Sequence, residues 1–390
     1  MKIVFVSNLF PDTAEPYRGL DNSNLLHYLS RHCTVRVISP RPTRPLAFGG
    51  KIPRRVPCPV DAQFEPQYPT ALYIPKVGSA FNHLLFARAI RQPLAELRKS
   101  FPFDTILCSW IYPDGCAVAR VARRNGIPFV ISAQGSDVHV YLRMAFRRRL
   151  ITAAANASAG VITRSRKLAD LLNEAGVARE RLHAAYNGVD LRTFCPGDRK
   201  TARLALGLSS DEPTILFIGN FLQIKNPLLL VTAHAELCRR MEARCRLVMI
   251  GDGPLRRQAR RKAKSVGTLG QIAFVGRQPP ALVARYMQAA DLLCVSSDNE
   301  GVPNVILEAF ACGLPVVASR VGGIPEVLCH DFLGCLVEPS RPEALARVLA
   351  QTLPHKHDTA RIIQHAQQFS WEATAKAYFD VLKAATPPET

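Results

Sequence analysis

Two glutamates, Glu300 and Glu308, lie close together in a run that begins as a polar turn and continues as an apolar helix. A carboxylate has two acceptor oxygens, so it can bind a pair of neighbouring hydroxyl groups, such as those of a sugar ring or a ribose. Gly301 allows a ligand to approach the backbone closely, and Pro303 suits the first turn of a helix, where N–H groups attract phosphate. These features predict a nucleotide-sugar site. The alternative is a solvated Glu308 and a Glu300 that only favours the helix dipole.

The segments around this run predict the elements that position it. Residues 291–296 and 315–319 are short apolar runs without a polar face, which is typical of parallel strands buried on both sides. Between them, Asn304 and Glu308 are four residues apart and share one face of the predicted helix. In such sheets ligands bind beyond the carboxyl ends of the strands, where this turn lies. The opposite face of the helix is apolar and is expected to pack on the sheet: Val302, Val305, Ile306, Ala309 and Phe310.

The run from Glu300 to Val327, EGVPNVILEAFACGLPVVASRVGGIPEV, resembles the donor-site signature of retaining glycosyltransferases of family 4, which have the glycosyltransferase B fold. The match is contiguous. The resemblance implies that Glu300 contacts sugar hydroxyls of the donor and that Glu308 holds the ribose hydroxyls. It also implies that the turn and the helix start meet the diphosphate, at Gly301, Val302, Pro303, Asn304 and Val305.

A second strand end, from Gly219 to Asn226, carries Lys225, whose ammonium group could neutralise a leaving diphosphate. In the resembled family this strand end typically has Gly-Arg followed by a lysine. Here Lys225 matches and Asn220 replaces the arginine. Gly276 and Arg277 match a family turn near the base of the nucleotide.

The first half of the chain is expected to supply the acceptor side. Gly19 lies in a segment that resembles the glycine loop near the donor phosphate, although many family members have two adjacent glycines. Asp114 and Asp137 follow consecutive predicted strands and are candidates for the cleft. Family members often have His-Gly-x-Asp at the second place, near the reacting sugar, whereas this chain has Gln134. A glutamine can donate to a sugar oxygen but cannot take a proton, so a histidine base at this position is not expected.

The resemblance implies a reaction that retains the anomeric configuration, in which the departing diphosphate oxygen takes the acceptor proton. Glu300, Lys225, Asp137 and Gln134 are then the candidate catalytic residues, which orient the substrates and stabilise charge on the diphosphate. Asp298-x-Glu300 could be mistaken for a metal-binding Asp-x-Asp motif, but its position at a predicted helix start and the pattern of the resembled family favour a site without metal. No cofactor and no metal ion are therefore expected.

The alternation of apolar runs and helical segments predicts an α/β protein with two Rossmann-like domains facing each other across a cleft. Residues 1–190 form the predicted acceptor-side domain and residues 191–368 the predicted donor-binding domain. In the resembled family, a terminal helix like that expected in residues 369–390 crosses back to the first domain. The predicted strands are residues 2–7, 34–39, 105–110, 128–133, 159–164 and 182–187, and then 214–219, 245–251, 272–276, 291–296, 315–319 and 333–338.

The net charge of +19 is concentrated in the first half of the chain. Residues 1–195 hold 27 Lys/Arg and 13 Asp/Glu, whereas residues 196–390 hold 23 and 18. The Pro-rich basic segment 40–59 is either a flexible acceptor-side loop or a surface insertion. A basic segment with interspersed apolar residues predicts either an amphipathic helix on an anionic membrane or a solvated helix face; its arginines are Arg143, Arg147, Arg148 and Arg149.

The first residues carry no signal-peptide cleavage site, and no apolar run reaches the length of a membrane span, so a cytoplasmic location is expected, with contact to the inner face of the cell membrane as an option. The eleven cysteines form no C-x-x-C pair and suggest neither disulfides nor a zinc site.

The leading interpretation is an enzyme that moves a sugar from a nucleotide-sugar donor to a glycan or lipid-linked acceptor in surface polysaccharide biosynthesis. Two alternatives are a sugar-nucleotide epimerase or phosphorylase on the same fold, and a non-catalytic scaffold that binds nucleotide sugars. Nucleic acid is not an expected partner, because the chain has no aromatic-basic RNA signature and no zinc module.

Overall fold

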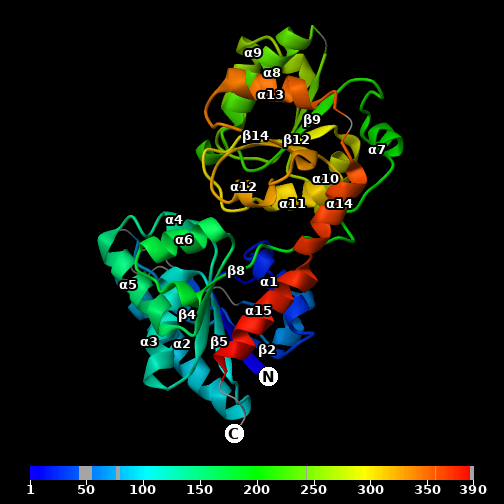
Figure 1. The fold of residues 1–390 in the computed structure, drawn as a ribbon. Coiled ribbons are helices and arrows are strands. Elements are labelled where there is room, and N and C mark those ends of the chain that lie inside the picture. The colour runs from blue at the N-terminus through cyan, green and yellow to red at the C-terminus, as the bar shows by residue number, and fades with distance from the viewer. Residues whose placement is uncertain (44–54, 76–79, 243, 356, 387–390) are drawn as a thin grey trace. The chain divides into compact units, whose positions relative to one another are not determined.

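The computed structural model describes residues 1–43, 55–75, 80–242, 244–355 and 357–386, and the chain divides into two compact units. The first unit contains residues 1–187 and 371–390, and the second contains residues 188–370. Each unit has a six-stranded sheet of parallel strands with helices packed against it (Figure 1). The predicted fold class, α/β with two Rossmann-like domains, is confirmed.

The inner strands of the first sheet are buried on both faces, whereas its last strand is largely exposed. Next to one edge of the sheet, β1 (Lys2–Val6) pairs in parallel with β2 (Thr34–Ile38) on one side and β5 (Thr105–Ser109) on the other. The sheet continues through β6 (Phe129–Ala133), β7 (Gly160–Thr163) and β8 (Leu182–Ala184), in the order β2-β1-β5-β6-β7-β8.

Alternate residues of β1 contact different helix layers because successive side chains of a strand point to opposite faces. Val4 and Val6 pack into a cluster with residues of α2, α3 and α5, whereas Ile3 and Phe5 pack with residues of α1 and α15. The helices of the first unit are α1 (Leu20–Leu29), α2 (Asn82–Ser100), α3 (Cys116–Arg124), α4 (Ser136–His139), α5 (Ala145–Ala157), α6 (Arg166–Glu174) and α15 (Trp371–Ala385).

The second sheet has the strand order β11-β10-β9-β12-β13-β14. Its strands are β9 (Thr214–Ile218), β10 (Arg246–Ile250), β11 (Ile272–Gly276), β12 (Leu292–Val295), β13 (Val316–Ser319) and β14 (Gly334–Val337). Its helices are α7 (Arg199–Leu206), α8 (Pro227–Met241), α9 (Arg256–Ser265), α10 (Pro280–Ala289), α11 (Asn304–Ala311), α12 (Ile324–Val327), α13 (Pro342–Thr352) and α14 (Thr359–Ala366).

All twelve predicted strands are present in these two sheets. A further pair, β3 (Arg41–Thr43) with β4 (Thr70–Leu72), was not predicted. Most of the Pro-rich segment 40–59 lies outside the described residues, so its predicted role as a loop stays a prediction. None of the described helices is both long and apolar enough to cross a membrane.

The last helix, α15, belongs to the first unit although the second unit precedes it in the chain (Figure 1). It packs against α1, and the prediction that a terminal helix returns to the first domain is confirmed. The Tyr378 hydroxyl lies 2.6 Å from the Ser132 hydroxyl at the end of β6. The buried stripe of α15 follows helical spacing: Trp371, Ala375, Tyr378 and Leu382.

Candidate functional site

Lys225 and Glu300, predicted from two separate motifs, form an ion pair in the second unit. Lys225 lies in the loop between β9 and α8, and Glu300 lies in the loop between β12 and α11. Because β9 and β12 are adjacent parallel strands, their carboxyl ends bring these loops together. The Ser297 hydroxyl donates a 2.7 Å hydrogen bond to the same Glu300 oxygen that meets the lysine. The pair is half-buried, since the side chains of Lys225 and Glu300 are 27% and 11% exposed.

Asp298 holds the two loops together. Its carboxylate accepts hydrogen bonds from the Asn226 amide at 3.0 and 3.1 Å, and from the Ser340 hydroxyl at 3.2 Å. Its backbone N–H donates to the Ile224 carbonyl at 2.9 Å. Asn226 in turn caps α8 by accepting from the Leu229 N–H at 3.2 Å. Asp298 therefore braces the site that Lys225 and Glu300 occupy.

A glycine turn after β13 packs directly against the backbone of Glu300. Gly322 has φ +54°, and a Cβ atom built there would lie 1.7 Å from the Glu300 carbonyl oxygen. The neighbouring Gly323 N–H donates to the Gly301 carbonyl at 2.9 Å. Only glycine fits this close approach, so the first glycine of the Gly-Gly pair in the motif has a structural reason.

Helix α11 begins at Asn304, directly after Gly301, Val302 and Pro303, and carries Val305 in its first turn. Of the predicted packing face, Ile306, Ala309 and Phe310 are buried, whereas Val302 and Val305 are half-buried. Glu308 is half-buried on the helix four residues beyond Asn304. Three further predicted residues lie near the carboxyl ends of strands in the same sheet. Asn220 lies just after β9, Gly276 is the last residue of β11, and Arg277 follows it. Asn220 and Arg277 are exposed.

In the first unit, Asp137 is fully buried and braces the loops at the ends of β5 and β6. Its carboxylate accepts from the N–H groups of Ile111 at 2.8 Å, Gln134 at 3.0 Å and Gly135 at 2.8 Å. Burial raises the pKa of Asp137, although these hydrogen bonds oppose the shift. The geometry supports a positioning role for Asp137; the predicted catalytic role stays a prediction.

Asp114 is also fully buried, and its predicted place in the cleft stays a prediction. It accepts from the Asn8 N–H at 2.6 Å and from the Asn8 side-chain amide at 2.7 Å. Burial raises the pKa of Asp114 to about 7, although the bonds from Asn8 oppose the shift. Like Asp137, Asp114 holds a loop in place, here the loop that follows β1 and contains Asn8.

Gln134 lines a cavity of about 350 Å³ in the first unit, together with Gly19, Trp110 and other residues. Its amide nitrogen donates to the hydroxyl groups of Ser109 at 2.8 Å and Ser132 at 3.1 Å, and its oxygen accepts from Arg164 Nε at 3.0 Å. Both amide hydrogens are therefore engaged within the protein. Donation to a sugar oxygen, as predicted, would require one of these bonds to break.

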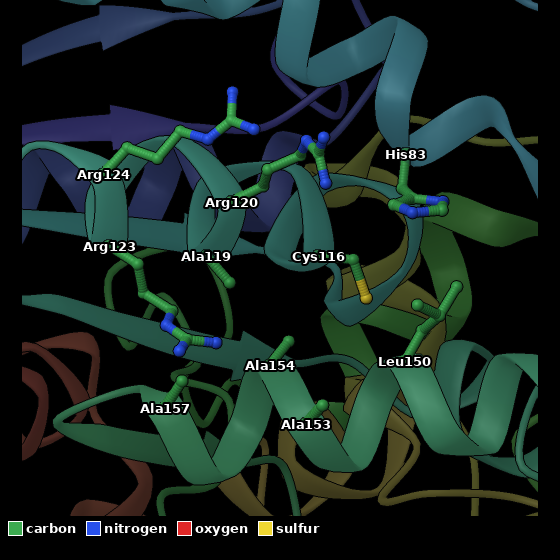
Figure 2. Close-up of a pocket in the computed structure, with 10 residues that line it drawn as sticks. All are labelled: His83, Cys116, Ala119, Arg120, Arg123, Arg124, Leu150, Ala153, Ala154 and Ala157. Carbon is green, nitrogen blue, oxygen red and sulfur yellow. The ribbon is translucent and has the colours of Figure 1, made fainter.

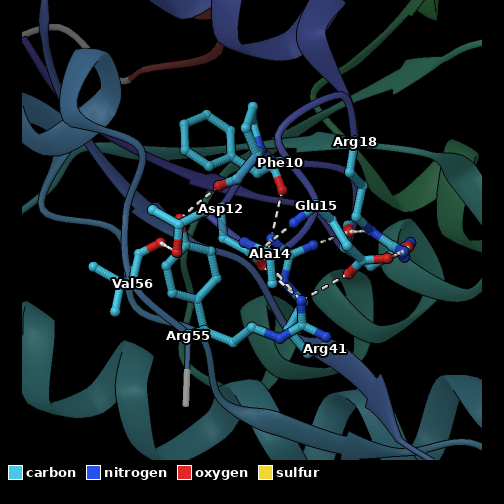
Figure 3. A network of polar contacts seen from close by, with 12 residues as sticks. Phe10, Asp12, Ala14, Glu15, Arg18, Arg41, Arg55 and Val56 are labelled. Atoms are coloured by element: carbon cyan, nitrogen blue, oxygen red, sulfur yellow. Dashed lines mark hydrogen bonds and ion pairs between the residues drawn. The ribbon is translucent and has the colours of Figure 1, made fainter. Parts of the chain in front are cut away.

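The loop between β1 and α1, which leads to Gly19, is held by buried ion pairs (Figure 3). Arg41 and Arg55 both contact the buried Asp12 carboxylate, at 2.8 and 3.0 Å, and Arg55 also pairs with Glu15 at 2.9 Å. Burial alone would raise the pKa of Asp12, but the hydrogen bond from the Glu15 N–H and the Arg41 charge outweigh it, so this pKa is lowered. These residues were not predicted, because nothing in the sequence pairs them.

Arg18 connects this loop to the buried Asp114. Its Nε and Nη2 atoms donate to the Asn8 carbonyl and side-chain oxygens at 2.7 and 2.8 Å, and Asn8 binds Asp114. The next residue, Gly19, has φ +67°, and a Cβ atom there would lie 2.3 Å from the Leu9 carbonyl oxygen. A single glycine thus suffices for the tight start of α1.

Comparison with known proteins matches both halves of the chain. Residues 23–193 match the description "Glycosyltransferase Family 4", and residues 198–369 match "Glycosyl transferases group 1". A D-inositol 3-phosphate glycosyltransferase of Frankia alni is 31% identical over 310 residues, which cover 73% of this chain and 75% of that protein. One of Segniliparus rotundus is 35% identical over 214 residues, covering 53% of this chain and 47% of that protein.

The chain spans only about half the length of several such relatives, including the Segniliparus protein. Among solved structures, Anabaena HepE in complex with UDP aligns with a TM-score of 0.75 at 20% identity, covering 98% of this chain and 100% of that one. This likeness shows the fold.

Proposed function

Because this chain belongs to glycosyltransferase family 4, with the glycosyltransferase B fold, we propose that it transfers a sugar from a nucleotide-sugar donor to a hydroxyl group of a glycan or lipid-linked acceptor. We place this reaction in the synthesis of a surface polysaccharide. The observation that carries the proposal is the ion pair between Lys225 and Glu300 at the ends of adjacent strands. It joins one cation and one hydroxyl-binding carboxylate at the edge of a parallel sheet, where such sheets bind ligands.

In the proposed reaction, the donor diphosphate attracts the Lys225 ammonium away from Glu300. The released carboxylate then accepts hydrogen bonds from the sugar hydroxyls, while Lys225 stabilises the charge that develops on the leaving diphosphate. Glu308 holds the ribose, and the start of α11 faces the phosphates. Binding of the donor thus converts an internal ion pair into two contacts with the substrate.

We propose that the anomeric configuration is retained and that no metal ion takes part. The acceptor oxygen bonds to the anomeric carbon on the face that the diphosphate leaves, and the acceptor proton passes to the departing diphosphate oxygen. Two observations support this scheme: Gln134 cannot act as a base, and Asp298 already binds Asn226 and Ser340. In this scheme, Asp137 and Asp114 hold in place the loops that follow the strands of the first unit.

Proteins that resemble this chain guide the choice of substrates to test. The curated relatives from Frankia and Segniliparus are named for inositol 3-phosphate, and the HepE structure contains UDP. UDP and its sugars are therefore the first donors to examine. Phosphorylated acceptors follow from the names of these relatives. The excess positive charge of the first half of the chain would suit a phosphorylated acceptor or an anionic lipid-linked one.

The experiment is calorimetric titration of the full chain with a panel of nucleoside diphosphates and nucleotide sugars in the presence of a chelator. The Glu308→Ala variant serves as the control for the predicted ribose contact. We expect one nucleotide sugar to bind without metal and to bind at least about tenfold more weakly to the variant, because a charged hydrogen-bond acceptor is lost. Failure of every nucleotide to bind the native chain would refute the proposed donor site and favour a scaffold.

A further inference from the structure

Two grooves cross the outer face of the first unit, and both are lined by arginine. The first, about 420 Å³, runs between α3 and α5, and the second, about 400 Å³, runs between α2 and α3. Figure 2 shows Arg123 reaching from α3 toward α5, where Ala153, Ala154 and Ala157 leave room, whereas Arg124 extends away from α5. We call this the α2–α3–α5 face, and its arginines are Arg88, Arg91, Arg120, Arg123 and Arg124.

The charge of these arginines is not compensated within the described residues. All five are exposed, and none has a hydrogen bond or ion pair with another described residue. No carboxylate is among the described residues that line either groove. His83 adds no charge at neutral pH, since burial, with Arg120 nearby, lowers its pKa.

The spacing on α3 increases the repulsion. Arg120 and Arg124 are four residues apart and therefore lie on one side of the helix, where like charges destabilise it. A face that concentrates uncompensated cations around two grooves is complementary to an anionic partner. The excess charge of the first half of the chain, 27 basic against 13 acidic residues, agrees with this.

Exposed apolar side chains adjoin the grooves. Leu84 lines the second groove and is 37% exposed, and Phe81, three residues earlier at the start of α2, is 56% exposed. Phe146 on α5 is 51% exposed and lies one turn before Leu150, which lines the first groove. Apolar side chains beside arginines are typical of surfaces that lie in a membrane interface.

One of the four arginines in the basic segment predicted from the sequence is engaged within the protein. The Arg147 guanidinium lies over the rings of Tyr141 and Tyr112, at 4.4 and 5.0 Å from their centroids, and is half-buried. Exposed arginines of this unit lie on α2 and α3, beyond the predicted segment, as well as at Arg143, Arg148 and Arg149.

We propose that the α2–α3–α5 face binds the anionic surface of a phospholipid membrane, with lipid phosphates in the two grooves and with Phe81, Leu84 and Phe146 in the interface. An acidic glycan or a nucleic acid would match the charge, but would leave these apolar side chains exposed. The proposal rests on the proposed function in one respect, since it would bring the enzyme to a lipid-linked acceptor.

The test is flotation of the full chain with vesicles of phosphatidylcholine alone, or with about one third phosphatidylglycerol, with Arg120→Gln/Arg123→Gln/Arg124→Gln as the variant. We expect binding to the anionic vesicles only, and a loss of about a hundredfold in the variant, because each basic side chain near the surface contributes about tenfold or less. A matched control, Arg257→Gln/Arg260→Gln/Arg261→Gln on the basic helix α9 of the second unit, changes the same charge and should lose less than about threefold.

A second variant, Phe146→Ser, should weaken vesicle binding at high salt, where the apolar contribution remains. Equal losses in the α3 and α9 variants would overturn the proposal, since net charge alone would explain them. Displacement from vesicles by inorganic pyrophosphate at the same phosphate concentration would also overturn it, in favour of a soluble anion site. Nucleoside diphosphate binding without vesicles should be unchanged in the α3 variant, so failure of the donor site is detected separately.

Discussion

At the scale of single residues, the ion pair between Lys225 and Glu300 predicts how removal of Glu300 changes ligand binding by Lys225. In Glu300→Ala, the Lys225 ammonium loses its partner and becomes available to a diphosphate. We therefore expect the free nucleoside diphosphate to bind as tightly as before or up to about fivefold more tightly, since a partly exposed ion pair contributes about 1 kcal/mol or less. The intact nucleotide sugar should bind at least about tenfold more weakly, because its hydroxyls lose an acceptor. Calorimetry with both ligands measures the two effects.

The comparison with Glu308→Ala makes this prediction specific. A ribose contact is common to both ligands, so Glu308→Ala should weaken the diphosphate and the nucleotide sugar alike. If Glu300→Ala weakened both ligands by the same factor, the division of roles between the two glutamates would be wrong.

Asp114 predicts a pH dependence of stability. Burial raises its pKa from 3.8 to about 7 in the folded protein, so the folded chain holds this proton more tightly than the unfolded chain does. As the pH rises from about 4 to about 7, the unfolded chain loses the proton first, and the free energy of unfolding falls. Asp114→Asn removes this titration. The stability of the variant relative to the native chain should therefore increase from pH 5 to pH 8.

Tryptophan fluorescence can follow this change during thermal unfolding, because both tryptophans, Trp110 and Trp371, lie in the first unit. Ser109→Ala, beside the same loops, is the control and should shift the unfolding temperature by the same amount at every pH. Parallel pH profiles for the native chain and Asp114→Asn would contradict the assignment of the raised pKa.

The sequence identified Glu300 and Lys225 as members of two motifs, but it could not show that they contact each other. For Asp114 and Asp137, the sequence predicted their positions after consecutive strands, but it could not show that both carboxylates are fully buried. Their environment depends on partners distant in the chain: Asn8 is 106 residues from Asp114, and Ile111 is 26 residues from Asp137. Such pairings leave no local pattern, so burial could not be predicted from strand-end position alone.

At the scale of elements, strands were the most predictable feature. Most of the twelve strands in the two main sheets are short apolar runs, because a parallel strand covered on both faces has no polar side. The edge strand β8 (Leu182–Ala184) differs, since its residues are half-buried or exposed. The pair β3 and β4 escaped prediction, since Arg41–Thr43 and Thr70–Leu72 have neither an apolar run nor a regular alternation. Their pairing depends on segments that are distant in the sequence.

The glycine turn after β13 gives a prediction at this scale. In Gly322→Ala, the new Cβ atom would meet the Glu300 carbonyl oxygen at 1.7 Å, so the β12–α11 loop must shift. We expect a loss of stability of about 2–4 kcal/mol and weaker binding of the nucleotide sugar. Gly207→Ala is the matched control, because Gly207 also has positive φ (+64°) but nothing lies within 4 Å of its Cβ position. It should cost about 1 kcal/mol and leave binding unchanged. Equal effects of the two substitutions would show that backbone strain, and not the contact with Glu300, is responsible.

At the scale of the whole molecule, the two units differ in how the chain builds them. The second unit is one continuous segment, residues 188–370, and its two ends are paired, with the Val189 N–H donating to the Phe369 carbonyl at 2.8 Å. The first unit is discontinuous and needs α15, which comes from the end of the chain. The second unit should therefore be self-sufficient, whereas residues 1–187 should not.

Separate expression of the two units tests this difference. Residues 188–370 alone should unfold cooperatively and bind the nucleoside diphosphate about as well as the full chain, because Lys225, Glu300 and Glu308 all lie within them. Residues 1–187 alone should lack stable tertiary structure. They lose the buried Trp371, Tyr378 and Leu382 side chains, each contributing about 1.5–3 kcal/mol, which together approach the net stability of a typical domain.

Fusing residues 371–390 to residues 1–187 through a flexible linker should restore cooperative unfolding, followed by Trp110 fluorescence. Tyr378→Phe in this fusion removes the 2.6 Å contact with Ser132 and should lower the unfolding temperature by a few degrees, since one buried hydroxyl loses its partner. Cooperative unfolding of residues 1–187 without α15 would contradict the role assigned to this helix, whatever the second unit binds.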